Sequence, residues 1–183
     1  TASPLVTVNS TTMVNCYSST GFSQSLPISA NLTIMMVIHY NPFNASIQDY
    51  GTFFQHGDVL TDISIIKKPN TSDQISFTSY SDIYNSLQLT NNTTYIIVGR
   101  VTGNTRELWA HSQSGSSTYM TANGVSINPR ASATLYIGRG SEASRSYFGE
   151  ILYYNNAISN EAINMNVTYL RNKWFNVNSS VKY

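Results

Sequence analysis

Trp109 and His111 are the two residues whose types and spacing most directly suggest a binding surface. They lie two positions apart on the alternating segment 105–112, so on a β-strand both side chains point to the same face. An indole ring with an imidazole beside it can stack on a sugar ring and hydrogen-bond to it, and is one element of a saccharide platform. Packing within a core is the alternative for Trp109, because tryptophan is highly buried on average.

Other aromatic side chains lie near amide, hydroxyl or guanidinium groups, the combination that sugar recognition requires. Together with Trp109 and His111, the candidate ligand-binding residues are Tyr80, Tyr84, Asn85, Tyr119, Arg139, Arg145 and Tyr147. Arg145 belongs to the polar loop 141–146 between two expected strands, a position that suits variable recognition. Half-buried packing within a sheet is the alternative for each tyrosine.

The acidic residues do not form the pair that glycoside hydrolysis needs. A retaining hydrolase places two carboxyl groups about 5 Å apart, which on one strand requires positions i and i+2 or i+4. Of the nine acids, only Asp58 and Asp62 have that spacing, and they lie beside a turn signal at Gly57. We therefore assign no catalytic residue. A lyase that uses tyrosine or histidine as a base stays open, because such sites are assembled across strands.

The remaining histidines favour structural roles. His39 ends an expected core strand, and His56 ends another before Gly57, so both are expected to be packed, hydrogen-bonded sheet residues. The histidines and the single cysteine form no cluster with zinc-ligand spacing.

The composition indicates a neutral, hydrogen-bonding surface. Charged residues are 10% of the 183, whereas the chain holds 20 Asn, 26 Ser, 19 Thr and 13 Tyr. Such a surface suits neutral glycans or another protein. Nucleic-acid binding needs a clustered basic face, and the formal net charge of +1 argues against that partner. The longest apolar run, 34–38, is too short for membrane insertion.

Short apolar and aromatic runs separated by turn residues predict an all-β fold. The expected strands are 5–8, 32–40, 51–56, 59–67, 74–79, 82–89, 94–102, 105–112, 117–121, 133–138 and 147–154. Many short strands with such punctuation are typical of an antiparallel sandwich. The run 34–38 does not alternate, so we expect a central strand buried on both faces. Segments 59–65 and 94–99 are expected to be neighbours with one wetter face, and Gly103-Asn104 the tip of a hairpin.

The last part of the chain predicts a helix over 160–174. Ser159 can cap its first turn, and an apolar stripe follows at Ile163, Val167, Leu170 and Trp174. Such a stripe must pack on something, and we expect the sandwich edge or the base of the sheets.

The order of elements from residue 135 onward resembles the C-terminal end of the laminin-G-like, concanavalin A-like family. The residues that carry the resemblance are Ile137, Gly138, Arg139, Phe148, Gly149, Glu150, Ile151, Tyr154, Asn155, Ile158, Ser159, Tyr169, Leu170, Lys173 and Trp174. The segment 160–163 departs from the acidic pair and arginine usual in that helix. The resemblance covers about a quarter of the chain. It implies a concanavalin A-like antiparallel β-sandwich (jelly roll) with a short C-terminal α-helix. The length of the chain fits one domain over 1–183. Because the chain begins at Thr1 without a Met, we expect it to be a fragment of a larger protein.

The same resemblance leaves the cofactor open. Relatives of this family often bind calcium through loop carboxylates, for which Asp58, Asp62, Asp73 and Asp82 are the candidates, although a rich cluster of aspartates is missing. No other cofactor is expected.

Together these features favour a non-catalytic recognition domain that binds a glycan or a cell-surface receptor. The composition is similar to that of viral spike, fibre and capsid-associated proteins, which favours the virion surface or another extracellular location. Assembly into homo-oligomers through the parent protein is compatible with that role. Two alternatives remain: a structural capsid or assembly domain, and a polysaccharide-degrading enzyme.

Overall fold

The computed structural model describes residues 5–8, 11–15, 22–41, 52–57, 63–67, 73–79, 82–124, 127–138 and 146–175. These ranges contain the strands β1 (Leu5–Val8), β2 (Thr11–Asn15), β3 (Phe22–Ile28), β4 (Leu32–Tyr40), β5 (Thr52–His56), β6 (Ile63–Lys67), β7 (Gln74–Ser79), β8 (Asp82–Gln88), β9 (Thr93–Thr102), β10 (Thr105–Ser112), β11 (Ser117–Asn123), β12 (Arg130–Ile137) and β13 (Tyr147–Tyr154), and the helix α1 (Asn160–Trp174).

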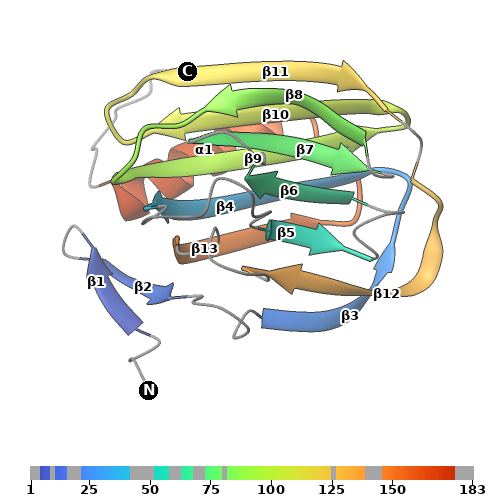
Figure 1. The fold of residues 1–183 in the computed structure, drawn as a ribbon, viewed down its shortest axis with the longest axis horizontal. Coiled ribbons are helices and arrows are strands. Elements are labelled where there is room, and N and C mark those ends of the chain that lie inside the picture. Colours follow the sequence, from blue (N-terminus) through green and yellow to red (C-terminus); the bar gives the residue numbers. More distant parts are fainter. Residues whose placement is uncertain are drawn as a thin grey trace.

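The strands form two antiparallel sheets that face each other (Figure 1). One sheet has the strand order β1-β2-β13-β4-β9-β10-β11, and the other has the order β3-β12-β5-β6-β7-β8. Helix α1 packs on the outer face of the seven-stranded sheet (Figure 1). The fold is therefore all-β, an antiparallel β-sandwich of the jelly-roll type with a C-terminal helix, as the sequence predicts.

Strand β4 is buried on both faces because each face meets a different hydrophobic layer. Ile34, Met36 and Ile38 join the core between the two sheets. Met35 and Val37 point the other way, into a second cluster beneath α1. All nine residues of β4 are buried. This confirms the prediction made from the run without alternation, and the helix explains it.

Helix α1 has the cap and the apolar stripe that its sequence predicts, but it does not lie at the expected edge or base of the sandwich. The Ser159 hydroxyl accepts a hydrogen bond from the Ala162 amide, and Ile163, Val167 and Leu170 form the buried stripe. These side chains cover the middle of the seven-stranded sheet, so the expected position at the edge or base is wrong. The reason is that β4 and β9 also present apolar side chains outward, Met35 and Ile96 among them. No helix within the described ranges has the length and hydropathy needed to cross a membrane.

A β-bulge in β13 fits the sheet to the end of α1. Phe148 pairs with Ile38 and Ile151 pairs with Met36, so Gly149 and Glu150 together oppose one residue of β4. Phe148 and Ile151 can then both pack in the inter-sheet core. Trp174 of α1 lies over Gly149, where an added Cβ would be 2.8 Å from its ring.

Most of the predicted strands are confirmed, two further strands are present, and two expectations about the sheets are wrong. Strands β2 and β3 were not predicted, since Thr, Ser and Gln dominate them. Segment 59–65 was expected beside 94–99, but β6 pairs with β5 and β7 in the six-stranded sheet, whereas β9 pairs with β4 and β10. Nor does β9 have a wetter face over 94–99, because all six residues are buried. Residues 59–62 lie outside the described ranges.

Candidate functional site

Three neighbouring strands present the best-defined group of polar and aromatic side chains, on the outer face of the seven-stranded sheet. Strands β9 and β10 form the predicted hairpin, with Gly103 at φ +59° in its turn, and β11 is the outermost strand of the sheet. The strict alternation of burial in β10 turns Leu108 and Ala110 inward and Trp109 outward. We call the outward-facing group the β9–β11 patch; its members are Arg100, Glu107, Trp109, His111, Ser117 and Tyr119.

Two aromatic rings form the centre of the patch. Trp109 and Tyr119 are register partners on β10 and β11, and their ring centroids are 5.0 Å apart. Trp109 also packs against the hydrophobic cluster beneath α1, whereas Tyr119 is 50% exposed. The packing alternative for Trp109 is therefore correct in part: the indole is partly buried and supports the exposed phenol ring.

A charged pair holds the aromatic rings in place. Arg100 Nε donates to Glu107 Oε2 at 2.6 Å, and the Tyr119 hydroxyl donates to Glu107 Oε1 at 3.2 Å. The Arg100 guanidinium also lies 5.3 Å from the centroid of the Trp109 ring, within cation–π range, and donates to the carbonyl of Ile158. Because the charges compensate each other, the patch is close to neutral here and its aromatic geometry is preorganised.

His111 forms the other end of the patch. Its Nδ1 is 2.9 Å from the Ser117 hydroxyl. Burial lowers the pKa of His111, and the nearby positive charge of Arg171 lowers it further. The ring is therefore neutral at pH 7. Its Nε2 is buried and has no hydrogen-bond partner in the part of the chain that the structure describes.

One side of α1 runs along the patch. Arg171 contacts the end of β10, since its Nη1 is 3.5 Å from the Ser112 carbonyl oxygen. Tyr169 and Lys173 lie on the opposite side of the helix, where both contact Glu150 of β13. The helical repeat places Asn164 and Thr168 on the Arg171 side. An amide, a hydroxyl and a guanidinium thus share the side of α1 that contacts the end of β10.

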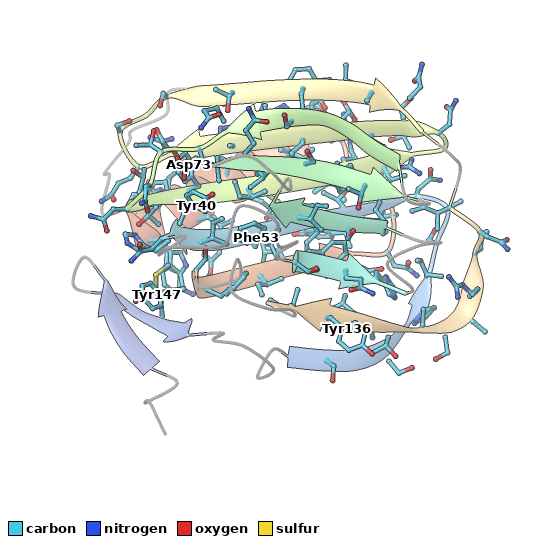
Figure 2. All side chains as sticks on the ribbon, viewed as in Figure 1. Tyr40, Phe53, Asp73, Tyr136 and Tyr147 are labelled. Carbon is cyan, nitrogen blue, oxygen red and sulfur yellow. The ribbon has the colours of Figure 1, made fainter. Side chains whose placement is uncertain are left out.

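The remaining predicted ligand-binding residues are not brought into this patch. Tyr147 lies beside β2 and stacks on His39 with a centroid distance of 5.8 Å (Figure 2). Strands β4 and β9 separate it from β10. Tyr84 and Asn85 belong to β8, which contacts β11 at the edge of the sandwich, but their side chains lie outside what the structure describes. Tyr80, Arg139 and Arg145 are outside the described residues.

His39 is a packed sheet residue, as predicted. Its Nε2 is 3.1 Å from Asn92 Oδ1 and its Nδ1 is 3.0 Å from Thr94 Oγ1. Because an amide oxygen only accepts, Nε2 carries the proton and Nδ1 accepts from the threonine. Burial lowers the pKa of His39, although the bond to Asn92 opposes that shift.

His56 is also a packed sheet residue and links the two sheets. Its Nε2 is 3.3 Å from the Leu26 carbonyl oxygen, so Nδ1 accepts the hydrogen bond of 2.9 Å from the Tyr153 hydroxyl of β13. Burial raises the pKa of Tyr153 to about 12. Of the contacts described above, this hydrogen bond most resembles the tyrosine and histidine that a lyase uses as its catalytic base. With His56 fully buried and Tyr153 protonated at neutral pH, it is poorly suited to abstract a proton.

The described acidic residues show no arrangement for metal binding. No group of three or more His, Cys, Asp or Glu side chains that could hold a metal ion occurs in the described ranges. Asp73 lies beside Tyr40, whose pKa is raised by burial and by the Asp73 charge (Figure 2). Asp58 and Asp62 lie outside the described residues, so calcium binding stays open, as it does in the sequence.

The outer face of the six-stranded sheet is polar, and it is closed to solvent at the central strands β5, β6 and β7. Register partners Tyr136, Gln55, Ser64 and Thr78 cross β12, β5, β6 and β7 in one row. Gln55, Ser64 and Thr78 are at most 5% exposed. Their hydroxyl and amide groups are therefore not offered to a ligand, and the β9–β11 patch is the stronger candidate site.

Four residues of this region were missed in the sequence: Arg100, Glu107, Ser117 and Arg171. Glu107 lies on the same alternating face as Trp109 and His111, and that pattern alone was sufficient to include it. Arg100 pairs with Glu107 across the predicted two-residue hairpin, so counting back from Gly103-Asn104 finds it. Arg171 depends on where α1 docks, for which the sequence holds no signal.

Comparison with known proteins supports the fold assignment. No protein family model matches the chain, and no curated protein matches it in sequence. Among solved structures, the enzymatically active domain of bacteriophage CBA120 tailspike protein 2 is similar, with a TM-score of 0.59 and 13% identity over 86% of this chain and 27% of that chain. The Trypanosoma rangeli sialidase in complex with sialic acid has a TM-score of 0.60 and 11% identity, over 95% and 30%.

These similarities concern the fold. The chain spans less than a third of the length of either protein, and the identities are far below those that carry function. The jelly-roll sandwich is therefore shared with a tailspike and a sialidase, and function must be argued from the patch itself.

Proposed function

We propose that this domain is a non-catalytic recognition module that binds a glycan through the β9–β11 patch. The observation that carries the proposal is the arrangement of Trp109, Tyr119 and Glu107. An exposed phenol ring is supported by an indole and fixed by a hydrogen bond to a carboxylate that is itself held by Arg100. Aromatic side chains with few degrees of freedom give large contact area at low entropic cost, which is the usual basis of a binding hot spot.

The surroundings of the patch fit a saccharide. Asn164, Thr168 and Ser117 offer amide and hydroxyl groups, which match the hydroxyls of a sugar in hydrogen-bonding capacity. The low overall charge of the chain provides little long-range electrostatic steering, so contacts within the patch itself must supply the affinity.

The proposed setting is the outside of a virion or a cell. A bacteriophage tailspike has a similar fold, and the chain is rich in Asn, Ser, Thr and Tyr. We further propose that the domain belongs to the laminin-G-like, concanavalin A-like superfamily, with the resemblance from residue 135 onward as the supporting observation. A cell-surface glycan or glycosylated receptor is then the partner.

A glycan array read with two matched tyrosine variants tests the proposal. Tyr119→Ala removes the exposed ring of the patch. Tyr169→Ala is the control, because Tyr169 is 45% exposed, donates to Glu150 and lies beside Lys173, on the other side of α1. We expect Tyr119→Ala to lose about tenfold or more in affinity, in the range of a hot-spot residue. The control should bind like the parent domain.

The other outcomes identify the alternatives. Equal losses in both variants, or binding untouched by Tyr119→Ala, place the ligand elsewhere. A flat array with concentration-dependent self-association in sedimentation supports a structural capsid or assembly domain. Release of soluble sugar from polysaccharide reveals an enzyme.

A further inference from the structure

Arg171 is a cation without a carboxylate partner in the described part of the chain, and it lies at the His111 end of the β9–β11 patch. Arg100 and Lys173 are paired with Glu107 and Glu150 at 2.6 and 2.8 Å. For Arg171 no carboxylate oxygen of the described residues lies within 4.0 Å. Its contacts are the Ser112 carbonyl oxygen at 3.5 Å and the Phe175 ring at 5.7 Å.

The neighbouring turn lies against the Arg171 guanidinium without bringing a charged side chain to it. Gly115, in the turn between β10 and β11, has φ +99° and no side chain, and an added Cβ would be only 3.7 Å from Arg171 Nη2. Around this glycine, the hydroxyls of Ser112, Ser114 and Ser116 are linked by hydrogen bonds. The guanidinium therefore faces a turn of small, neutral hydroxyl groups that adds no negative charge.

His111 lies close to the Arg171 cation but, as a neutral ring, adds no charge of its own. The Arg171 charge already depresses protonation of the imidazole, so the two groups are close enough to interact electrostatically. An anion that compensates the Arg171 charge therefore favours protonation of His111, whose Nδ1 is at the Ser117 hydroxyl. The charges at the other end cancel, since Arg100 and Glu107 form a pair.

The distance from the aromatic rings suits a single saccharide ligand. His111 is two residues beyond Trp109 on the same face of β10, and such positions are about 7 Å apart along a strand. A sugar placed on Tyr119 and Trp109 therefore brings a substituent, or the next sugar unit, towards Arg171. Guanidinium groups bind carboxylate, sulfate and phosphate with paired hydrogen bonds, far better than they bind hydroxyls.

From this arrangement we infer that the glycan recognised by the β9–β11 patch is acidic, with its anionic group bound by Arg171. The inference rests on the proposed function and adds the chemical class of the ligand. A helix-capping role for Arg171, as a cation in the last turn of α1, predicts no dependence of binding on ligand charge.

A matched array and a matched charge variant test this assignment. The array holds acidic oligosaccharides (uronate, sialylated, sulfated and phosphorylated) beside neutral counterparts made by methyl esterification or by removal of the acidic group. Arg171→Gln is compared with Lys173→Gln, which removes the same charge from the same helical turn on the opposite side. Circular dichroism confirms that both variants fold.

The expected result is binding to acidic members, at least tenfold weaker binding to their neutral partners, and a loss of about tenfold or more in Arg171→Gln. Lys173→Gln should bind as the parent does.

Proton NMR of His111 adds a second readout, since a bound anion should raise the pKa of the imidazole. Equal binding to charged and neutral partners, or an equal effect of the two variants, overturns the acidic assignment and leaves the glycan-binding proposal standing. No binding to any member overturns both.

Discussion

Trp109 and Tyr119 face each other across β10 and β11 with ring centroids 5.0 Å apart, and Tyr119 also donates a hydrogen bond to Glu107. The indole and the carboxylate therefore fix the phenol from two directions. Ordering an exposed tyrosine costs rotational entropy in the free domain, so a ligand that stacks on Tyr119 does not have to supply that cost on binding.

The hydrogen bond and the ring of Tyr119 make separable contributions to binding. Tyr119→Phe keeps the ring next to Trp109 but leaves one oxygen of Glu107 without its donor. We expect a loss of a few-fold in glycan affinity, clearly smaller than that of Tyr119→Ala, because about 1 kcal/mol is typical of one neutral hydrogen bond. Titration calorimetry of both variants measures the difference. Equal losses would show that the hydroxyl, rather than the ring, contacts the ligand.

Gly149 is required because Trp174 occupies the space that a side chain would need. Gly149→Ala places a Cβ 2.8 Å from the Trp174 ring, so we expect a loss of about 1–3 kcal/mol in the free energy of unfolding from overpacking. Urea denaturation measures it. In a Trp174→Leu background the same substitution should cost much less, and a double-mutant cycle gives the coupling. Additive effects would contradict the contact.

Glu150 makes the stability of the α1 contact dependent on pH. Burial raises the pKa of Glu150, but hydrogen bonds from Lys173, Trp174 and Tyr169 outweigh burial and hold it below the ordinary value of 4.5. A carboxyl with a depressed folded-state pKa stabilises the protein above its unfolded pKa and loses that contribution as the pH falls through the folded value. The stability advantage of the parent domain over Glu150→Gln should therefore be largest at neutral pH and shrink below about pH 4.5. Denaturation between neutral pH and about pH 3 checks this; a constant difference would mean that the ionised carboxylate is not involved.

Ser159 contributes to stability through the first turn of α1. Its hydroxyl accepts from the Ala162 amide, so Ser159→Ala should lower the free energy of unfolding by about 1 kcal/mol. Ser159→Asp keeps an acceptor and provides the control, with stability close to the parent. Thermal denaturation of the three proteins distinguishes a capping role from a general effect of substitution, which both variants would share.

The sequence predicts the helix and most strands because their signals are local. The cap at Ser159, the stripe from Ile163 to Leu170 and the alternation around Trp109 each depend on neighbours along the chain. The strand pairings of β6 and the docking of α1 depend on contacts between distant parts of the chain. An apolar run in the sequence shows that a strand is buried, but it does not show which strand pairs with it or whether a helix covers it. The need for glycine at position 149, within the bulge, is likewise not visible in the sequence, because it arises from the Trp174 ring that packs over it.

The candidate site was recoverable in part. Trp109, His111 and Tyr119 were identified from residue type, and the register of the Gly103-Asn104 hairpin contains Arg100 and Glu107. Arg171 could not be found, because its neighbours Ser112 and Gly115 are remote in sequence and meet it only after the helix has docked.

The most direct test of glycan binding at the patch uses Trp109 as a reporter. The chain has two tryptophans, so Trp174→Phe leaves Trp109 as the single indole fluorophore. Titration with the oligosaccharide bound most strongly on the array should change the Trp109 emission in a saturable way, with a dissociation constant matching calorimetry. Calorimetric binding with unchanged Trp109 emission would contradict the assignment of the ligand to the β9–β11 patch.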